Sequence, residues 1–248
     1  MKKGLYLTAK LKTLACCLGA VFIFIFVSLL IAAEKSVSVS SGLLEKPVIV
    51  IDAGHGGEDG GTQSASGILE KDINLSIALM LEDELEKNGF TTVMIRDSDR
   101  LIYDENSTTM RSKKSSDIHN RLSIMKANRG CIFLSIHQNH FSESKYSGAQ
   151  VFYRPGHSDS TALAESIQQS IVSSLQKDNT RQIKPCTSSV YLIYNAVSTA
   201  VMVECGFLSN EVEAEKLNSS EYQYKMTLAI VQGLMNYLST KDVTSYGS

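Results

Sequence analysis

Short, almost continuously apolar runs that alternate with amphipathic segments constrain the fold of this chain most strongly. The runs that predict strands are Val48–Ile51, Phe90–Arg96, Cys131–Ile136, Gly148–Tyr153, Val190–Tyr194 and Ala200–Val203. Helical periodicity lies between them, from Ile73 to Asn88 and over Asp117–Asn128, Ser160–Gln176, Glu211–Leu217 and Glu221–Leu238, while residues 97–115 are polar and loop-like. Strands that are apolar on both faces are typical of sheets covered by helices on both sides. We therefore predict an α/β fold, a three-layer sandwich with a mostly parallel, twisted sheet flanked by helices on both faces.

The first 33 residues differ in character from the rest of the chain. They contain four lysines and no acidic residue, and their apolar run of 20 residues, Leu14–Ala33, is long enough to span a bilayer. The positive end predicts a cytoplasmic N-terminus with the remainder outside. We interpret residues 1–33 as a membrane anchor or a signal segment, 34–46 as a linker, 47–240 as one catalytic domain and 241–248 as a tail. The protein is thus expected to be extracytoplasmic, either membrane-anchored or secreted.

The charge of the external part limits its partners. Without the four N-terminal lysines, 20 basic residues stand against 26 acidic ones, which gives a formal charge of −6. This acidic balance argues against nucleic acid as a partner and leaves the N-terminal segment, or another protein, to hold the domain at the membrane. Three cysteines follow residue 33, and an odd number cannot be fully paired within one chain. We expect Cys131, in an apolar run, to be a buried thiol.

Three polar residues follow apolar runs directly, and a fourth lies close to them along the chain. His55 stands in the glycine-rich loop after the first run, His137 follows Ile136, and Glu204 follows Val203. Glu70 lies just before the first predicted helix. Ligands of such sheets bind beyond the carboxyl ends of the strands, so these side chains are expected to meet at one edge. Two imidazoles and a carboxylate are typical of a catalytic zinc site that keeps one position open.

The fourth residue has a different expected role. Hydrolysis at such a site needs a second carboxylate, not bound to the metal, that takes a proton from water and passes it to the leaving amine. Glu204 is our candidate, because a carboxylate at the end of a buried strand is costly without a task. Other interpretations stay open on the residues alone: His137 as a strand-end histidine, and Glu70 as an ordinary acid in the first turn of a helix, where the helix dipole favours it.

Four motifs carry a resemblance to a known family. They are Val50-Ile-Asp-Ala-Gly-His-Gly-Gly-Glu-Asp-Gly-Gly-Thr62, Glu70-Lys-Asp-Ile-Asn-Leu75, Ser135-Ile-His-Gln-Asn139 and Val203-Glu-Cys-Gly-Phe-Leu-Ser-Asn210. In order and spacing, over residues 47–238, the chain resembles the zinc-dependent N-acetylmuramoyl-L-alanine amidases. The resemblance implies Zn²⁺ ligands at His55, Glu70 and His137 and a catalytic acid/base at Glu204. It also implies hydrolysis of the amide between N-acetylmuramic acid and L-alanine in peptidoglycan.

The layout, a single domain behind an N-terminal apolar segment, is similar to that of the sporulation amidases. That similarity implies action on spore cortex, muramic-δ-lactam formation, germination, and a location between the forespore and mother-cell membranes. The same similarity implies an activating protein partner, and since no inserted segment is long enough to plug a groove, we expect regulation to come from outside the chain. Three alternatives stay open: a vegetative cell-wall amidase, a zinc peptidase acting on stem peptides, and a wall-binding domain without turnover.

Two departures from the expected pattern concern the neighbours of the second histidine. Gln138 and His140 are bulkier than the small residues expected there, and both are predicted to alter the shape of the groove. His140 alternates away from His137 along the strand, so we expect it at the surface. We expect the same of His119 and His157.

Overall fold

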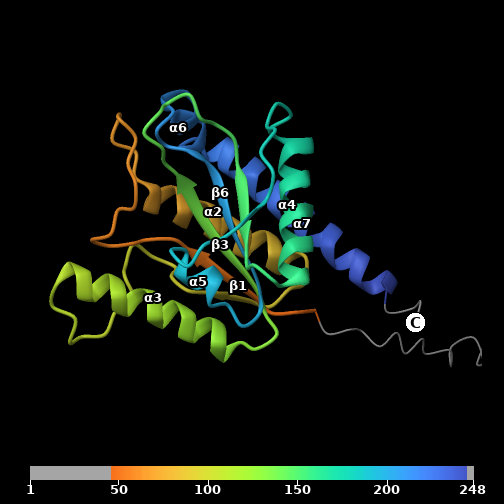
Figure 1. Ribbon diagram of the computed structural model, residues 1–248, viewed down its shortest axis with the longest axis horizontal. Coiled ribbons are helices and arrows are strands. Elements are labelled where there is room, and N and C mark those ends of the chain that lie inside the picture. Colours follow the sequence, from red (N-terminus) through yellow and green to blue (C-terminus); the bar gives the residue numbers. More distant parts are fainter. Residues whose placement is uncertain (1–45, 245–248) are drawn as a thin grey trace, which may run out of the picture. The chain divides into compact units, whose positions relative to one another are not determined.

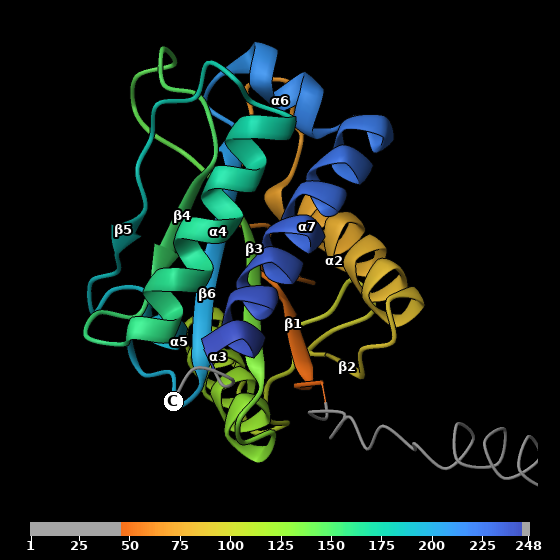
Figure 2. The ribbon, with the colours of Figure 1, turned by 90° about the vertical axis from the view of Figure 1, so that its right-hand side faces the viewer.

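The structure, a computed structural model, describes residues 46–244 (Figure 1). The predicted anchor or signal segment, residues 1–33, and all of the linker except Lys46 lie outside the described residues. Within residues 46–244, no helix is both long enough and apolar enough to cross a membrane. The predicted three-layer α/β sandwich is confirmed: a six-stranded sheet lies between helices on both of its faces (Figures 1 and 2).

The sheet is mixed, with parallel strands forming the part that carries the predicted site. Its order is β2-β1-β3-β6-β4-β5. The pairs β2–β1, β1–β3 and β3–β6 are parallel, whereas β4 is antiparallel to β6 and parallel to β5. The strands are β1 (Ile49–Ala53), β2 (Thr92–Met94), β3 (Ile132–Asn139), β4 (Gln150–Tyr153), β5 (Lys184–Pro185) and β6 (Thr199–Phe207).

The helices divide between the two faces of the sheet. One face is covered by α2 (Glu70–Lys87), α4 (Ser158–Ser174) and α7 (Ser220–Thr244), which lie in front of the sheet in Figure 2. The other face is covered by α3 (Met110–Ala127) and the short α5 (Tyr191–Tyr194). The remaining helix, α6 (Glu211–Leu217), follows β6 and contributes to the first core.

Alternation along the strands explains why they are apolar throughout. In β1, Ile49 and Ile51 pack into the core under α2, α4 and α7, while Val50 packs into the core under α3 and α5. Successive side chains of a strand point to opposite faces, so a sheet with two covered faces needs apolar residues at both sets of positions. The two cores hold the strand ends at fixed places, and the predicted site lies at those ends.

The prediction of a strand at Val190–Tyr194 is wrong. Residues Tyr191–Tyr194 form α5, and Leu192 and Ile193 are both buried in the core beneath α3. A short apolar run does not distinguish a strand from a buried helical turn, because both bury adjacent apolar residues. The strand at this edge is instead β5, whose two residues, Lys184 and Pro185, carry no apolar pattern.

Some predicted boundaries also differ. The predicted 97–115 loop ends earlier, because α3 begins at Met110 behind a capping box formed by Thr109 and Ser112. The first two helical turns of α3 are polar and lack apolar periodicity, so the sequence did not indicate that the helix begins there. At the other end of the chain, α7 continues to Thr244, so the predicted tail at 241–248 begins within a helix.

Candidate metal centre and active site

His55 is presented by a sharp backbone turn at the end of β1. Its φ of 62° lies in the left-handed region, which is uncommon outside glycine. Gly54, which precedes it, allows the second histidine to approach closely: a Cβ at Gly54 would lie 2.3 Å from the ring of His137. A Cβ at Gly61 would likewise lie 2.5 Å from the Glu70 carboxylate. The glycines of this loop therefore make room for the polar residues to converge.

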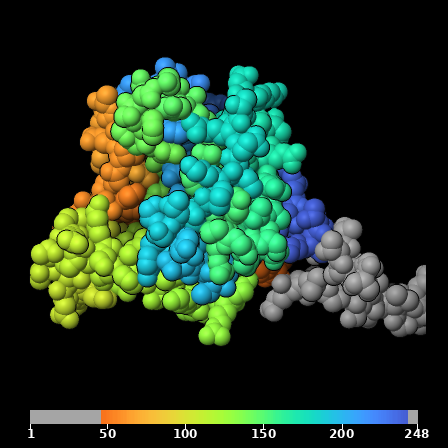
Figure 3. All heavy atoms as spheres, in the orientation of Figure 1, coloured from red at the N-terminus to blue at the C-terminus, as the bar shows by residue number. Residues whose placement is uncertain are grey.

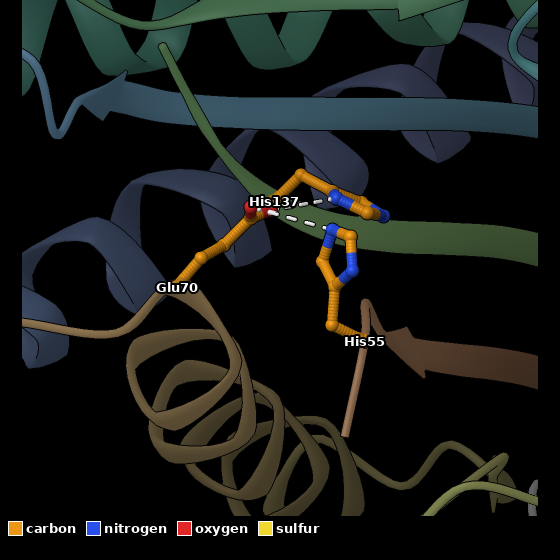
Figure 4. A group of neighbouring side chains, drawn as sticks. All are labelled: His55, Glu70 and His137. Atoms are coloured by element: carbon orange, nitrogen blue, oxygen red, sulfur yellow. Dashed lines mark hydrogen bonds and ion pairs between the residues drawn. The ribbon is translucent and has the colours of Figure 1, made fainter. Parts of the chain in front are cut away.

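Glu70 lies between the two histidines. It is the first residue of α2, rather than just before the helix as predicted, and it is buried. Its Oε1 lies 2.8 Å from Nδ1 of His137, and its Oε2 lies 3.3 Å from Nε2 of His55, as Figure 4 shows. The candidate ligand atoms of the three residues all lie within 4.8 Å of one another. The structure thus brings the three predicted metal ligands together.

Further hydrogen bonds fix the three candidate ligands. Asp59 accepts a hydrogen bond from Nδ1 of His55 over 2.9 Å, which directs the Nε2 of that ring toward Glu70. The backbone N–H groups of Thr62 and Gln138 donate to the Glu70 carboxylate over 2.8 and 3.1 Å. A carboxylate behind a histidine and donors behind a carboxylate are the usual supports of metal ligands. The donor set of two imidazoles and one carboxylate fits Zn²⁺.

These contacts also set the charge of the group. Burial alone would lower the pKa of His55, but hydrogen bonds with Asp59 and Glu70 outweigh it and raise that pKa to about 9. Burial would raise the pKa of Glu70, but His137 and His55 outweigh it and lower that pKa. The carboxylate therefore stays ionised at neutral pH and available to a cation.

Two buried arginines, which sequence reasoning missed, hold the loop that carries His55. Arg121 donates to the backbone oxygens of Ala53 and His55 over 2.9 and 2.8 Å. Arg96 donates to the same Ala53 oxygen over 2.8 Å and to the Gly54 oxygen over 3.0 Å. Arg121 also pairs with Asp52 over 2.6 Å. Asp52 could have indicated a buried basic residue from the sequence, because an acidic residue inside an apolar strand needs a buried counter-charge.

We expect Arg121→Met to destabilise the protein strongly. The substitution leaves Asp52 and Asp117, which both pair with Arg121 at 2.6 Å, buried without their partner. Removing one side of a buried ion pair costs about 3 to 5 kcal/mol. Urea unfolding should show this loss, whereas Arg129→Met, at an exposed position after α3, should change the free energy of unfolding little. Equal stability of the two variants would contradict the assigned role.

Glu204 lies beside the candidate metal ligands. In β6 it is the register partner of His137, so the two side chains point to the same face of the sheet. Its Oε2 is shielded from solvent and has no hydrogen-bond partner among the described residues. Burial, together with the nearby Glu70, outweighs the two histidines and raises the pKa of Glu204 to about 7. Such a carboxylate can exchange protons near neutral pH.

The raised pKa predicts a pH-dependent stability difference between the metal-free wild type and Glu204→Gln. The folded-state pKa of about 7 exceeds the ordinary 4.5, so the folded state binds the proton of Glu204 more tightly than the unfolded state does. The resulting stabilisation of the fold is fully present below pH 4.5 and is lost as the pH rises through 7. Relative to the variant, the wild type should lose up to about 3 kcal/mol between pH 4.5 and pH 8. Urea unfolding with a chelator measures this. Glu105→Gln, at an exposed site, serves as the control, and a difference that is constant with pH would contradict the prediction.

The remaining histidines lie apart from this group. His119 and His140 are exposed, as predicted. His157 is half-buried rather than at the surface, because its ring accepts a hydrogen bond from the backbone N–H of Ser160 and caps α4. Gln138 does not shape a groove as predicted: it is buried, and its Nε2 donates to Asn74 over 3.1 Å. Asn74 in turn donates to Glu70 over 3.3 Å, so Gln138 supports the candidate ligand from behind.

Comparison with known proteins identifies the family. The family model described as N-acetylmuramoyl-L-alanine amidase matches residues 49–236, a range that contains all four site residues. The chain belongs to the N-acetylmuramoyl-L-alanine amidase family. The predictions of this family and of an enzyme are thereby confirmed.

Individual members of the amidase family are similar over most of the domain. The CwlD amidase from Clostridioides difficile, solved in complex with the GerS lipoprotein, is 39% identical and superposes with a TM-score of 0.76, covering 79% of this chain and 100% of that one. The germination-specific N-acetylmuramoyl-L-alanine amidase of Bacillus subtilis is 31% identical over 232 residues, which cover 94% of this chain and 97% of the relative. The B. subtilis amidase LytC is 30% identical over 200 residues, but these cover 78% of this chain and only 37% of LytC.

Proposed function

We propose that this protein is a zinc-dependent hydrolase that cleaves the amide between N-acetylmuramic acid and L-alanine in peptidoglycan, outside the cytoplasm. The observation that carries the proposal is the position of Glu204 beside His55, Glu70 and His137, with a buried oxygen that has no hydrogen-bond partner within residues 46–244. A carboxylate next to a candidate metal centre, with a pKa of about 7, suits general acid–base catalysis. Membership of the amidase family supports the choice of bond.

The proposed roles follow from the contacts of each residue. His55, Glu70 and His137 would hold the zinc ion, which when bound supplies Lewis acidity to polarise the scissile carbonyl and to activate water. Glu204 accepts a proton from the attacking water and later delivers it to the nitrogen of L-alanine as the amide bond breaks. Asp59, through His55, and Asn74, through Glu70, keep the ligand side chains in place, so little reorganisation is needed during the reaction.

The relatives favour spore cortex as the substrate. The similar B. subtilis protein is named for germination and matches this chain almost end to end, whereas LytC extends far beyond the matched region. We therefore place the enzyme in sporulation, between the forespore and mother-cell membranes, where its product would lead to muramic-δ-lactam. The predicted N-terminal segment would attach it to the membrane. The GerS complex of the solved relative supports an activating protein partner.

Product analysis tests the proposed function. The purified full chain, supplied with zinc, is incubated with peptidoglycan from spore cortex and, separately, from vegetative wall, and the products are read by mass spectrometry. Free peptides that begin with L-alanine are expected, with cortex as the better substrate. New amino termini within the stem peptide would indicate a peptidase instead. Binding to both walls without any released peptide, even with a candidate partner added, would indicate a wall-binding domain.

A further inference from the structure

A cavity separate from the candidate metal centre opens at the same edge of the sheet. Its volume is about 630 Å³, and it lies beyond the end of β6 and the start of β4. None of the four site residues lines it. Four cationic side chains do, and we call this cavity the basic pocket: Lys145 from the segment between β3 and β4, Lys177 and Arg181 from the segment after α4, and Lys216 from α6.

The positive charge of the basic pocket is only partly neutralised. Two carboxylates, Asp178 and Glu213, also line it, and Lys145 already pairs with Glu143 over 2.5 Å. The two oxygens of Glu213 each accept a backbone N–H over 2.8 Å, from Gly148 and from Phe207, and its charge also acts on Arg181 and Lys216. Lys177 and Lys216 are exposed, and within residues 46–244 neither forms an ion pair with a carboxylate. A negative group that entered the pocket would find cations ready to pair with it.

Arg181 is held in a fixed orientation at the side of the pocket. Its guanidinium lies 4.4 Å from the ring centroid of Phe207, its Nε donates to the Ser147 oxygen over 2.9 Å, and its Nη1 donates to Oε1 of Gln150 over 3.3 Å. Its Nη2 has no hydrogen-bond partner in the part of the chain that the structure describes. A stacked guanidinium with an open donor is well suited to binding a carboxylate, because its orientation is already set.

The basic pocket is connected to the catalytic residue through one side chain. Gln150 of β4 is the register partner of Glu204 in β6, so both side chains point to the same face of the sheet. Neighbouring strands lie about 4.8 Å apart, so Gln150 is close to Glu204. The side chain of Gln150 in turn accepts a hydrogen bond from Arg181. A peptide held at Glu204 in an extended form, which advances roughly 3.3 to 3.6 Å per residue, can therefore pass Gln150 and approach Arg181. Figure 3 shows the surface hollowed between the orange residues of the 55–70 loop and the teal residues that follow α4.

We infer that the basic pocket, through Arg181 at its side, binds a carboxylate of the stem peptide beyond the L-alanine whose amide is cleaved. The inference rests on the proposed function, which it extends to the chemical class of the substrate: an acidic peptide rather than one whose carboxylates are amidated. Arg181 supplies the oriented donor, and Lys177 and Lys216 supply additional positive charge at the rim.

Two matched substrates test this inference. One is a muramyl peptide with free stem-peptide carboxylates, and the other is the same compound with those carboxylates amidated. The wild type should have the lower KM for the free acid. Lys177→Gln combined with Lys216→Gln should raise that KM by about tenfold with an unchanged kcat, and should leave the KM for the amidated compound nearly unaltered. Lys126→Gln, at an exposed position near the end of α3, is the matched control and should behave as the wild type.

A binding measurement separates failure of the inference from failure of the proposed function. The free peptide, acidic or amidated, is titrated into the zinc-loaded full chain by calorimetry, without turnover. Tighter binding of the acidic peptide, lost in the double lysine variant, supports the pocket even if neither muramyl peptide is cleaved. Equal affinity for the two peptides, or an equal loss of both in the variant, would overturn the inference even if cleavage proceeds.

Discussion

Replacing Glu204 with glutamine is expected to lower kcat by about 100-fold to 10,000-fold, the range typical of removing a general acid–base. Glutamine has nearly the shape of glutamate but cannot take up the proton of the attacking water. Because Glu204 lies outside the group formed by His55, Glu70 and His137, the variant should keep its zinc. Release of L-alanine-terminated peptide measures the loss, and elemental analysis of the same sample measures the metal.

The matched control for this experiment is Glu105→Gln, which removes a carboxylate from an exposed position and should leave kcat unchanged. A Glu204→Gln variant that keeps wild-type kcat would refute the role assigned to this residue. A variant that loses zinc in parallel with activity would instead make Glu204 a ligand.

Replacing His137 with alanine is expected to weaken zinc binding by more than about 100-fold, since loss of a ligand should exceed the 10- to 100-fold effect of losing an outer partner of one. The substitution removes one of the three clustered donors and also the contact of 2.8 Å with Glu70. Competition with a chromogenic chelator gives the affinity.

His140 provides a matched control three residues along the same segment. It is exposed and lies outside the metal-binding group, so His140→Ala should bind zinc as tightly as the wild type. Full metal occupancy in His137→Ala would remove His137 from the ligand set.

The central strands were predictable because burial on both faces leaves a plain apolar run. This holds for β1, β3 and β6, whose cores were identified from sequence, although β6 extends to Phe207, well beyond the predicted Val203. The helix α5 was not predictable, since four apolar residues fit a strand equally well. The start of α3 depends on a capping box rather than on apolar spacing, so the apolar pattern of the sequence did not predict where this helix begins.

The candidate site was predicted better than its supports. His55, His137 and Glu204 follow apolar runs, and that position is visible in the sequence. The roles of Arg96 and Arg121 depend on backbone oxygens that only the folded loop presents to them. The prediction that Gln138 alters the groove rested on its size alone, whereas strand alternation turns its side chain to the face opposite His137, where it is buried and donates to Asn74.

The strand β6 lies between β3 and β4, although it is the last of the six strands along the chain. The sheet therefore cannot close in the order in which it is synthesised: β4 must wait for β6, which begins more than 40 positions after β4 ends, before β4 and its neighbour β5 can join β3 through β6. Such long-range pairing slows folding, because the entropy of closing the intervening chain is lost before the contacts between the strands are gained. Since β6 also carries Glu204 to the face of His137, the candidate site is completed only once nearly the whole domain exists, and a truncated chain ending before β6 would have the candidate metal ligands without the carboxylate of Glu204.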